Sequence, residues 1–414
     1  MSENKNFFRA SAEDFKKIPG SPVAYWVSEA LKLSFQGQPI GSLVDTAQGM
    51  KTLDNERFVR LWFEVSMNRF ESIKWFPVNH GGGFRKWYGN NECVINWADD
   101  GREIKAFAVE KYNSVTRTVT GMDYYFRPGI TWTAISSSNF SVRSFPTGFL
   151  FTNAGMCAFG EEVNLQTAIA LLNSKVAGSI LEVLSPTINF GPNQIKQIPV
   201  VDKVRGDCGS VANMISICRK DWDAYETSWD FMVNPLVAER GVSGQSVVGS
   251  EQNGGLITDH CPLSTLYSRL REKWAKDCEE MRRLETENNR IFIEAYGLQD
   301  ELTPDVLWHE ITLTCNPWYR YGVKVDSGQC AVGSAASDHC TLPTDNLLEE
   351  RLKGDTVKEL ISYAVGCMMG RYSLEKPGLI LADQGAQVSD QWIVVSGQLA
   401  LRGKVAECVR KELQ

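Results

Sequence analysis

The chain has 414 residues, 43% of them hydrophobic and 22% charged, and a net charge of −7. This is the composition of a soluble globular protein with two or three domains, and the charge argues against tight nonspecific coating of DNA. No run of about 18 apolar residues predicts a membrane span, and the N-terminus does not resemble a signal peptide. The eleven scattered cysteines are therefore expected to be reduced thiols in a cytoplasmic protein.

The charge is unevenly divided along the chain. Residues 1–200 carry 20 Lys and Arg against 18 Asp and Glu, whereas residues 201–414 carry 23 against 32. A nucleic-acid groove needs local basic charge rather than a basic whole protein. The first half is therefore the better candidate for such a groove.

The first predicted elements are a helix and a β-rich region. Within a lead-in of residues 1–40, Ser21 and Pro22 favour the start of a helix over 21–35. Residues 41–205 alternate short β-rich runs with Gly and Asn turns, and they return to helix over 163–184. The clearest β-rich runs are 60–65, 92–97 and 141–145.

The second half is predicted to be helical. Residues 206–385 contain helices over 211–232, 262–296 and 355–369, with a flexible Gly/Ser-rich loop at 242–255. The long helix is either a core helix or a coiled-coil arm against 211–232. The fold class predicted is α+β: a mixed, mostly β domain over 41–205, followed by a helical domain over 206–385.

Five segments, in a fixed order, resemble one protein family: FKKIPGSPVAYW at 15–26, GGGFRKWYGN at 81–90, SPTINFGPNQIKQIPVV at 185–201, DWDAYETSWDF at 221–231 and GRYSLEKPGLILADQG at 370–385. The chain resembles the C-terminal part of the PglX family, the adenine-specific DNA methyltransferases of BREX phage defence, which are related to type IIG and IIL restriction-modification enzymes. The resemblance implies a target-recognition domain over 41–205 and a helical spacer over 206–385. It ends after Gly385, which leaves 386–414 as a divergent tail.

The resemblance implies methylation of adenine N6 from S-adenosylmethionine in the full-length family, but the motifs for this chemistry are not found here. The nearest match to the required Asn-Pro-Pro-aromatic tetrad is Asn316-Pro317-Trp318-Tyr319, and no cofactor-binding Gly turn precedes it. We interpret it as a turn that packs two aromatic rings. No catalytic residue and no cofactor are predicted for this chain.

Two segments are the candidates for DNA contact. Glycines allow close backbone approach to a phosphate, and Arg can read guanine, which favours Gly82, Gly83, Arg85 and Lys86. The alternative is a β-hairpin whose aromatic residues face the core. Small hydroxyl residues suit bases and phosphates, which favours the second set, Arg127, Ser137, Ser138 and Arg143; the alternative there is a solvated loop between strands. Lys175 and Lys196, which border the 185–201 segment, complete the predicted contacts.

Other chemistries are weakly represented. There is no Cys-x-x-Cys pair, and His260-Cys261 and His339-Cys340 are adjacent residues, which rarely share a zinc ion. No nucleophilic triad and no nucleotide-binding GxxxxGK[ST] motif occurs. No metal site is predicted.

Three hypotheses follow. The first is a double-stranded-DNA recognition module that is inactive without a missing N-terminal methyltransferase domain. The second is an independent binding protein, either a free-standing specificity subunit or a partner of BREX proteins or of phage DNA-mimic inhibitors. The third is an enzyme of unrecognised chemistry.

Overall fold

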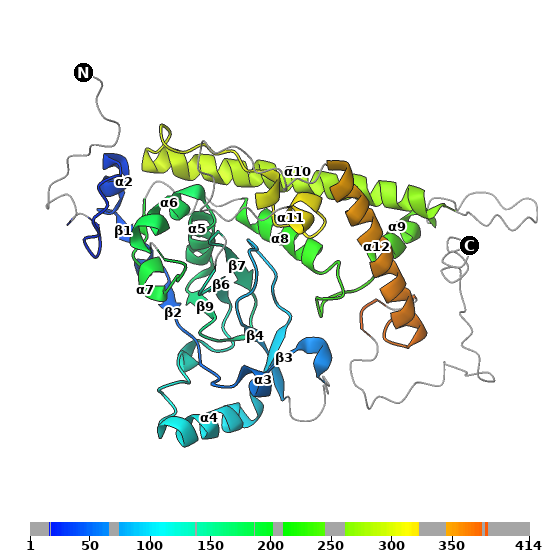
Figure 1. The fold of residues 1–414 in the computed structure, drawn as a ribbon, viewed down its shortest axis with the longest axis horizontal. Coiled ribbons are helices and arrows are strands. Elements are labelled where there is room, and N and C mark those ends of the chain that lie inside the picture. Colours follow the sequence, from blue (N-terminus) through cyan, green and yellow to red (C-terminus); the bar gives the residue numbers. More distant parts are fainter. Residues whose placement is uncertain are drawn as a thin grey trace, which may run out of the picture.

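The computed structural model describes residue 16 and residues 18–65, 74–136, 139–185, 187–201, 210–244, 261–322, 345–374 and 377–379. The predicted α+β class is confirmed: three small sheets in the first half are followed by helices. A long helix runs along one side of the molecule, with shorter helices between it and the sheets (Figure 1).

The first sheet is the centre of the β-rich region. Its strand order is β2 (Asp45–Ala47), β9 (Gly155–Phe159), β6 (Gly129–Thr133) and β7 (Val142–Phe145), and all neighbours are antiparallel. Four of the five residues of β6 are buried because helices and the second sheet cover both of its faces. Strand β7 confirms the strand predicted over 141–145.

A second sheet lies beside the first, in the order β3 (Val59–Leu61), β5 (Cys93–Asn96), β4 (Trp75–Asn79) and β8 (Leu150–Phe151). Only β8 is parallel to its neighbour. The predicted strand over 92–97 is confirmed, but the run 60–65 leaves the sheet after Leu61 and turns through a 3₁₀ helix. A two-stranded pair of β1 (Gln38–Pro39) and β10 (Pro199–Val200) joins the two ends of the β-rich region.

The helix predicted over 163–184 is wrong as a single element. It is two helices, α5 (Glu162–Leu172) and α6 (Lys175–Leu184), which meet at an angle of 77°. Ser174 caps α6 by accepting a hydrogen bond from the Ala177 amide. The Asn173 side chain bonds both main-chain groups of Val142 at 2.9 and 3.0 Å and so holds the break against β7.

Helices dominate after residue 210: α8 (Val211–Trp222), α9 (Pro235–Gly244), α10 (Leu263–Tyr296), α11 (Pro317–Tyr321) and α12 (Asp345–Met368). The long helix α10 is confirmed within one residue, and Gly297 ends it with a left-handed φ of 68°. It packs against α6, α8, α9 and α2 rather than against α8 alone. We therefore identify it as a core helix and not a coiled-coil arm.

Other helix boundaries correct the prediction. Ser28, not Ser21, caps the first described helix, α2 (Glu29–Ser34), and Tyr25 and Trp26 lie outside it with exposed rings. The helix expected over 211–232 ends at Trp222, and α12 begins ten residues before the expected 355. Three short or irregular helices in the β-rich region were not predicted: α3 (Asn55–Phe58), α4 (Ala98–Tyr112) and α7 (Pro192–Ile195).

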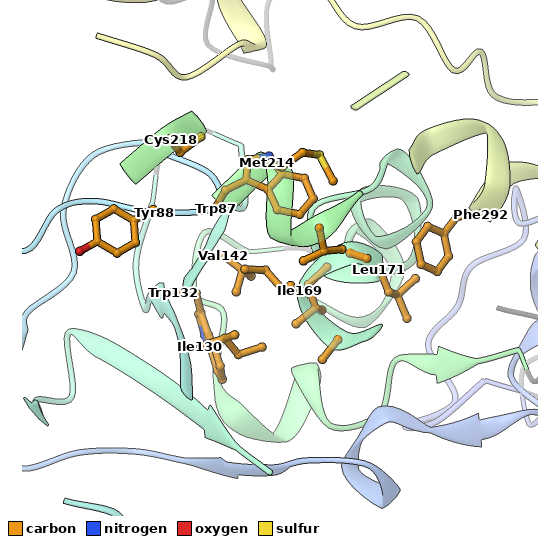
Figure 2. Packing of buried hydrophobic residues seen from close by; sticks show 14 of the residues in the cluster. Trp87, Tyr88, Ile130, Trp132, Val142, Ile169, Leu171, Met214, Cys218 and Phe292 are labelled. Carbon is orange, nitrogen blue, oxygen red and sulfur yellow. The ribbon is translucent and has the colours of Figure 1, made fainter. Parts of the chain in front are cut away.

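The larger hydrophobic core joins the first sheet to the helices. Figure 2 shows Trp87, Trp132 and Val142 from the β-rich region beside Ile169 of α5 and Met214 of α8. A second core lies between the sheets and α4, around Phe58, Ile95, Trp97 and Phe151. The larger core thus contains side chains from both sides of the boundary that we predicted at residue 205.

Two predicted segments fall largely outside the described residues. The loop predicted at 242–255 overlaps the end of α9 at 242–244, and the rest of it is not described; nor is the tail over 386–414. In the part of the chain that is described, no single helix is both long and apolar enough to cross a membrane. The bent pair α5 and α6 reaches that length and composition together, but its apolar side chains lie in the core.

Candidate nucleic-acid interface

The segment Gly81–Asn90 divides into an exposed half and a buried half. Gly82 and Gly83 are exposed. Arg85 is only 3% exposed and Lys86 9%. The predicted DNA-contact motif therefore turns inward after Phe84, toward the helices.

Every nitrogen of the Arg85 guanidinium has a protein partner. Nη2 donates to Asp221 Oδ2 at 2.7 Å, Nε donates to the Tyr88 carbonyl at 2.9 Å, and Nη1 donates to Thr314 Oγ1 at 2.9 Å. The guanidinium also lies 4.8 Å from the centre of the Trp222 ring. Burial alone lowers the pKa of Arg85, but the Asp221 carboxylate and weaker neighbours raise it above its usual value.

Lys86 and Trp87 share one carboxylate. Lys86 Nζ lies 2.6 Å from Glu285 Oε2, and Trp87 Nε1 donates to Glu285 Oε1 at 2.8 Å. Asp221 has a similar double role, because it also accepts from the amides of Thr314 and Cys315. We call Arg85, Lys86, Trp87, Asp221 and Glu285 the cation hub; it joins the β-rich region to α8 and α10.

The hub gives Arg85 and Lys86 partners within the protein. A buried cation needs a charged, hydrogen-bonded partner, and both cations already have one. The geometry thus supports a structural role and not the DNA contact expected from the sequence. The hairpin alternative holds in part: the segment connects the antiparallel strands β4 and β5, and the rings of Trp87 and Tyr88 lie in the core.

Arg143 is buried as well, with 1% of its surface exposed. Its Nη1 donates to the Arg85 carbonyl at 3.4 Å, and burial lowers its pKa to about 10. A side chain in this position does not reach a nucleic acid at the surface. The expectation of DNA contact at Arg143 is therefore not supported either.

The exposed half of the motif belongs to a surface that we call the uncharged edge. It consists of four segments at one end of the two sheets: His80–Phe84, Thr133–Ser136, Thr152–Gly155 and Thr187–Phe190. Hydrogen bonds join them: Thr133 Oγ1 donates to the Gly82 carbonyl at 3.0 Å, and the Ala134 amide donates to the Ala154 carbonyl at 2.9 Å. The Phe190 amide donates to the Ala134 carbonyl at 2.7 Å.

The uncharged edge contains no Lys, Arg, Asp or Glu, although the chain has 50 acidic residues. Burial lowers the pKa of His80 and so favours its uncharged imidazole. Its polar groups include main-chain groups, hydroxyls and the amides of Asn153 and Asn189, and these suit base edges and phosphate oxygens. Gly82 is required here, because its φ is +129° and an added Cβ would lie 2.5 Å from the Asn90 amide nitrogen.

The remaining predicted residues lie in separate places. Arg127 is exposed at the opposite end of β6, 5.5 Å from the Tyr124 ring, and Lys196 is exposed beside α7. Lys175 contacts the helical region, since its Nζ donates to the Asp305 carbonyl at 2.5 Å. Ser137 and Ser138 lie outside the described residues.

Two prominent residues of the edge were not predicted as contacts. Ile135 is 63% exposed and Ile188 is 58% exposed. Sequence reasoning looked for cations and hydroxyls and passed over apolar residues. The signal that could have found them is the absence of any charged residue from 133–140 and 187–190.

The Asn316–Tyr319 tetrad is part of the helical framework. The Asn316 amide donates to the carbonyls of Trp308 and Ile311 at 2.7 and 2.8 Å, and its oxygen accepts from the Trp318 amide. Tyr319 donates its hydroxyl to the Phe84 carbonyl, next to the cation hub. Since its polar atoms are already bonded, Asn316 does not fit the role of holding a target adenine. Among the described residues, no group of three His, Cys, Asp or Glu side chains is placed to hold a metal ion.

Comparison with known proteins shows that the chain is homologous to adenine-specific methyltransferases. It is 34% identical over 385 residues to the adenine-specific methyltransferase BrxX of Escherichia coli O9:H4 (strain HS). The aligned region covers 90% of this chain and 28% of that protein. It is 32% identical over 401 residues to the adenine-specific methyltransferase PglX of Lacticaseibacillus casei (strain Zhang), covering 92% and 29%. No protein-family model matches the chain.

The chain thus spans less than a third of the length of these relatives. The relation to PglX that the sequence suggested is confirmed as homology. A C-terminal position and a recognition role within such a protein stay predictions.

Proposed function

We propose that this chain is the DNA-recognition part of a PglX-type adenine methyltransferase of BREX phage defence. The observation that carries the proposal is homology to adenine-specific methyltransferases over nine-tenths of this chain. The architecture is compatible with it: a β-rich region presents an uncharged, hydrogen-bonding edge, and helices brace it from behind.

In this proposal the two parts of the glycine-rich motif have different tasks. The cation hub anchors Arg85 and Lys86 to α8 and α10, which holds the Gly82–Gly83 turn in place. The turn and its neighbours then meet bases and sugar-phosphate through main-chain and amide groups. Exposed Arg127 and Lys196 are the candidates for phosphate contacts beyond the edge.

Methyl transfer would depend on polypeptide outside this chain. S-adenosylmethionine supplies the methyl group in adenine methylation, and the target base has to leave the duplex to reach it. The bonded Asn316 amide gives no support for such a site in this chain. We therefore propose that the chain selects DNA and that a methyltransferase domain of the PglX type performs the chemistry.

The test is a fluorescence anisotropy titration with duplexes of random central sequence, repeated from about 50 to 200 mM salt. We expect binding that weakens steeply with salt, enrichment of one sequence class after selection, and no methyl transfer from radiolabelled S-adenosylmethionine by the chain alone. Failure to bind any duplex at about 50 mM salt would contradict the proposal and favour a protein-binding role. Methyl transfer by the chain alone would contradict the proposed division of labour.

A further inference from the structure

Two segments of the uncharged edge form a short antiparallel ribbon. Ile135 pairs with Asn189, the Ser136 amide donates to the Ile188 carbonyl at 3.0 Å, and the Phe190 amide donates to the Ala134 carbonyl at 2.7 Å. We call Ala134–Ser136 with Ile188–Phe190 the edge ribbon.

The ribbon is fixed at its base. Trp132 Nε1 donates to the Phe190 carbonyl at 2.8 Å, and Ser185 Oγ donates to the Asn189 carbonyl at 2.7 Å. The Phe190 ring lies 4.9 Å from the Phe140 ring. A ribbon anchored on a buried strand presents its outer groups in a defined geometry, as a recognition element requires.

The ribbon presents an exposed isoleucine on each of its faces. Directly paired residues point to the same face, and successive residues alternate. Ile135 therefore shares a face with Asn189, while Ile188 shares the other face with Ser136. With 63% and 58% of their surfaces exposed, the two isoleucines are among the more exposed large apolar residues of the described chain.

The shape and charge of the ribbon fit a DNA major groove, which is wide enough for a two-stranded β-ribbon. No carboxylate lies in the four segments of the edge, so none of its own residues repels the phosphates on either side. The apolar group that a major groove offers is the C5-methyl of thymine, which apolar side chains contact.

We propose that the edge ribbon enters the major groove of duplex DNA and that Ile135 and Ile188 contact thymine methyl groups there. This inference rests on the proposed role in DNA recognition and adds the groove, the reading element and one base that it prefers. Asn189, beside Ile135, carries the amide that bonds an adjacent base edge.

The probe is the duplex pool that the chain selects from random sequences, made once with thymine and once with uracil. Uracil removes only the methyl group and keeps every phosphate and base-pairing atom. We expect wild-type affinity to fall on uracil by about fourfold for each thymine methyl group that the ribbon buries. The double variant Ile135→Ala/Ile188→Ala should bind both pools equally, with an unchanged melting temperature because both side chains are exposed.

A carboxylate placed on the ribbon provides the second arm. Ile135→Asp should weaken binding more than about tenfold, because it faces the negatively charged groove. Val163→Asp is the matched control: Val163 is 50% exposed on α5, which follows the far end of β9, and it should change affinity less than about twofold.

Three results would overturn the inference while leaving DNA recognition intact. They are equal wild-type affinity for the two pools, a double Ala variant that still discriminates them, and equal losses in the two Asp variants. If the chain binds no duplex at all, the proposed function is wrong, and the inference that rests on it is wrong as well.

Discussion

The two halves of the Gly81–Asn90 segment meet opposite environments within a few residues. Gly82 and Gly83 lie in an exposed edge without formal charges, whereas Arg85 and Lys86 lie in a buried hub of two cations and two carboxylates. The two cations look like the DNA-binding part of the motif, but both form ion pairs with carboxylates of the protein itself. The residues left for a partner are the uncharged ones.

The ion pairs of the hub argue against a second role for its cations in DNA contact. A buried ion pair is held together largely because either charge alone would be costly to bury. If Arg85 turned to a phosphate, Asp221 would be left buried without its counter-charge. Asp221 also accepts hydrogen bonds from the amides of Thr314 and Cys315. The hub is thus a structural joint between the β-rich region and the helices, and the following variants test that division.

The largest expected effect is at Asp221. Asp221→Ala leaves the Arg85 guanidinium buried without a carboxylate and removes the acceptor of two amides. We expect a loss of about 3–5 kcal/mol in the free energy of unfolding, measured by urea titration. The control is Asp277→Ala, which breaks the more exposed pair with Lys220 and should cost about 0–1 kcal/mol. Equal losses would mean that the hub is not buried in solution.

The second effect is a coupling within the hub. Glu285→Gln leaves Lys86 buried without a counter-charge, and it should cost about 3 kcal/mol. The double variant Lys86→Met/Glu285→Gln removes both charges and keeps an acceptor for Trp87 Nε1. It should be more stable than Glu285→Gln alone, with a coupling energy of about 1–3 kcal/mol from urea titration. Additive losses would show that the two side chains are not paired.

The third comparison lies within the edge itself. Gly82→Ala forces a side chain into a φ of +129° and against Asn90, so it should cost about 1–3 kcal/mol. Gly83→Ala meets open space and should change the free energy of unfolding by less than about 0.5 kcal/mol. Thermal melting of the two variants checks this difference. If Gly83→Ala lowered the melting temperature as much as Gly82→Ala, the strained position of the turn would not be at Gly82.

The smallest effect on stability is expected at an exposed cation. Arg127→Ala should leave the melting temperature almost unchanged, since exposed charges contribute little to folding. If Arg127 meets a phosphate, the salt dependence of DNA binding should flatten by about one unit of slope. Arg102→Ala, on α4 and paired with Asp99, is the control and should leave the slope unchanged. Identical slopes for wild type and Arg127→Ala would exclude that contact.

Local patterns in the sequence predicted the elements whose signals are local. The apolar stripe and Gly297 mark α10, and the β-branched run around Val94 and Ile95 marks β5. Helix α4 was not predicted because its buried face is small and its first turn contains left-handed residues, Asp99 to Gly101. Ser28 and Ser174 are competing caps that shorten or divide helices which periodicity alone extends.

The site was harder to predict because its partners are distant in sequence. Arg85 finds Asp221 across 136 residues, and Lys86 finds Glu285 across 199. A motif of glycines and cations reads the same whether the cations face solvent or a carboxylate buried on another helix. The exposed Ile135 and Ile188 likewise become neighbours only through the strand pairing of the folded chain.

Amide hydrogen–deuterium exchange of the free and DNA-bound chain tests the account most directly. We predict slower exchange on DNA binding at Gly83, at Thr133–Ser136 and at Thr187–Phe190. We predict no change over Arg85–Tyr88, the stretch that contains the hub residues Arg85, Lys86 and Trp87. Protection confined to Arg127 or Lys196 would move the interface away from the edge. Faster exchange over Arg85–Tyr88 would show that DNA opens the hub to reach the two cations, and it would contradict the division proposed here.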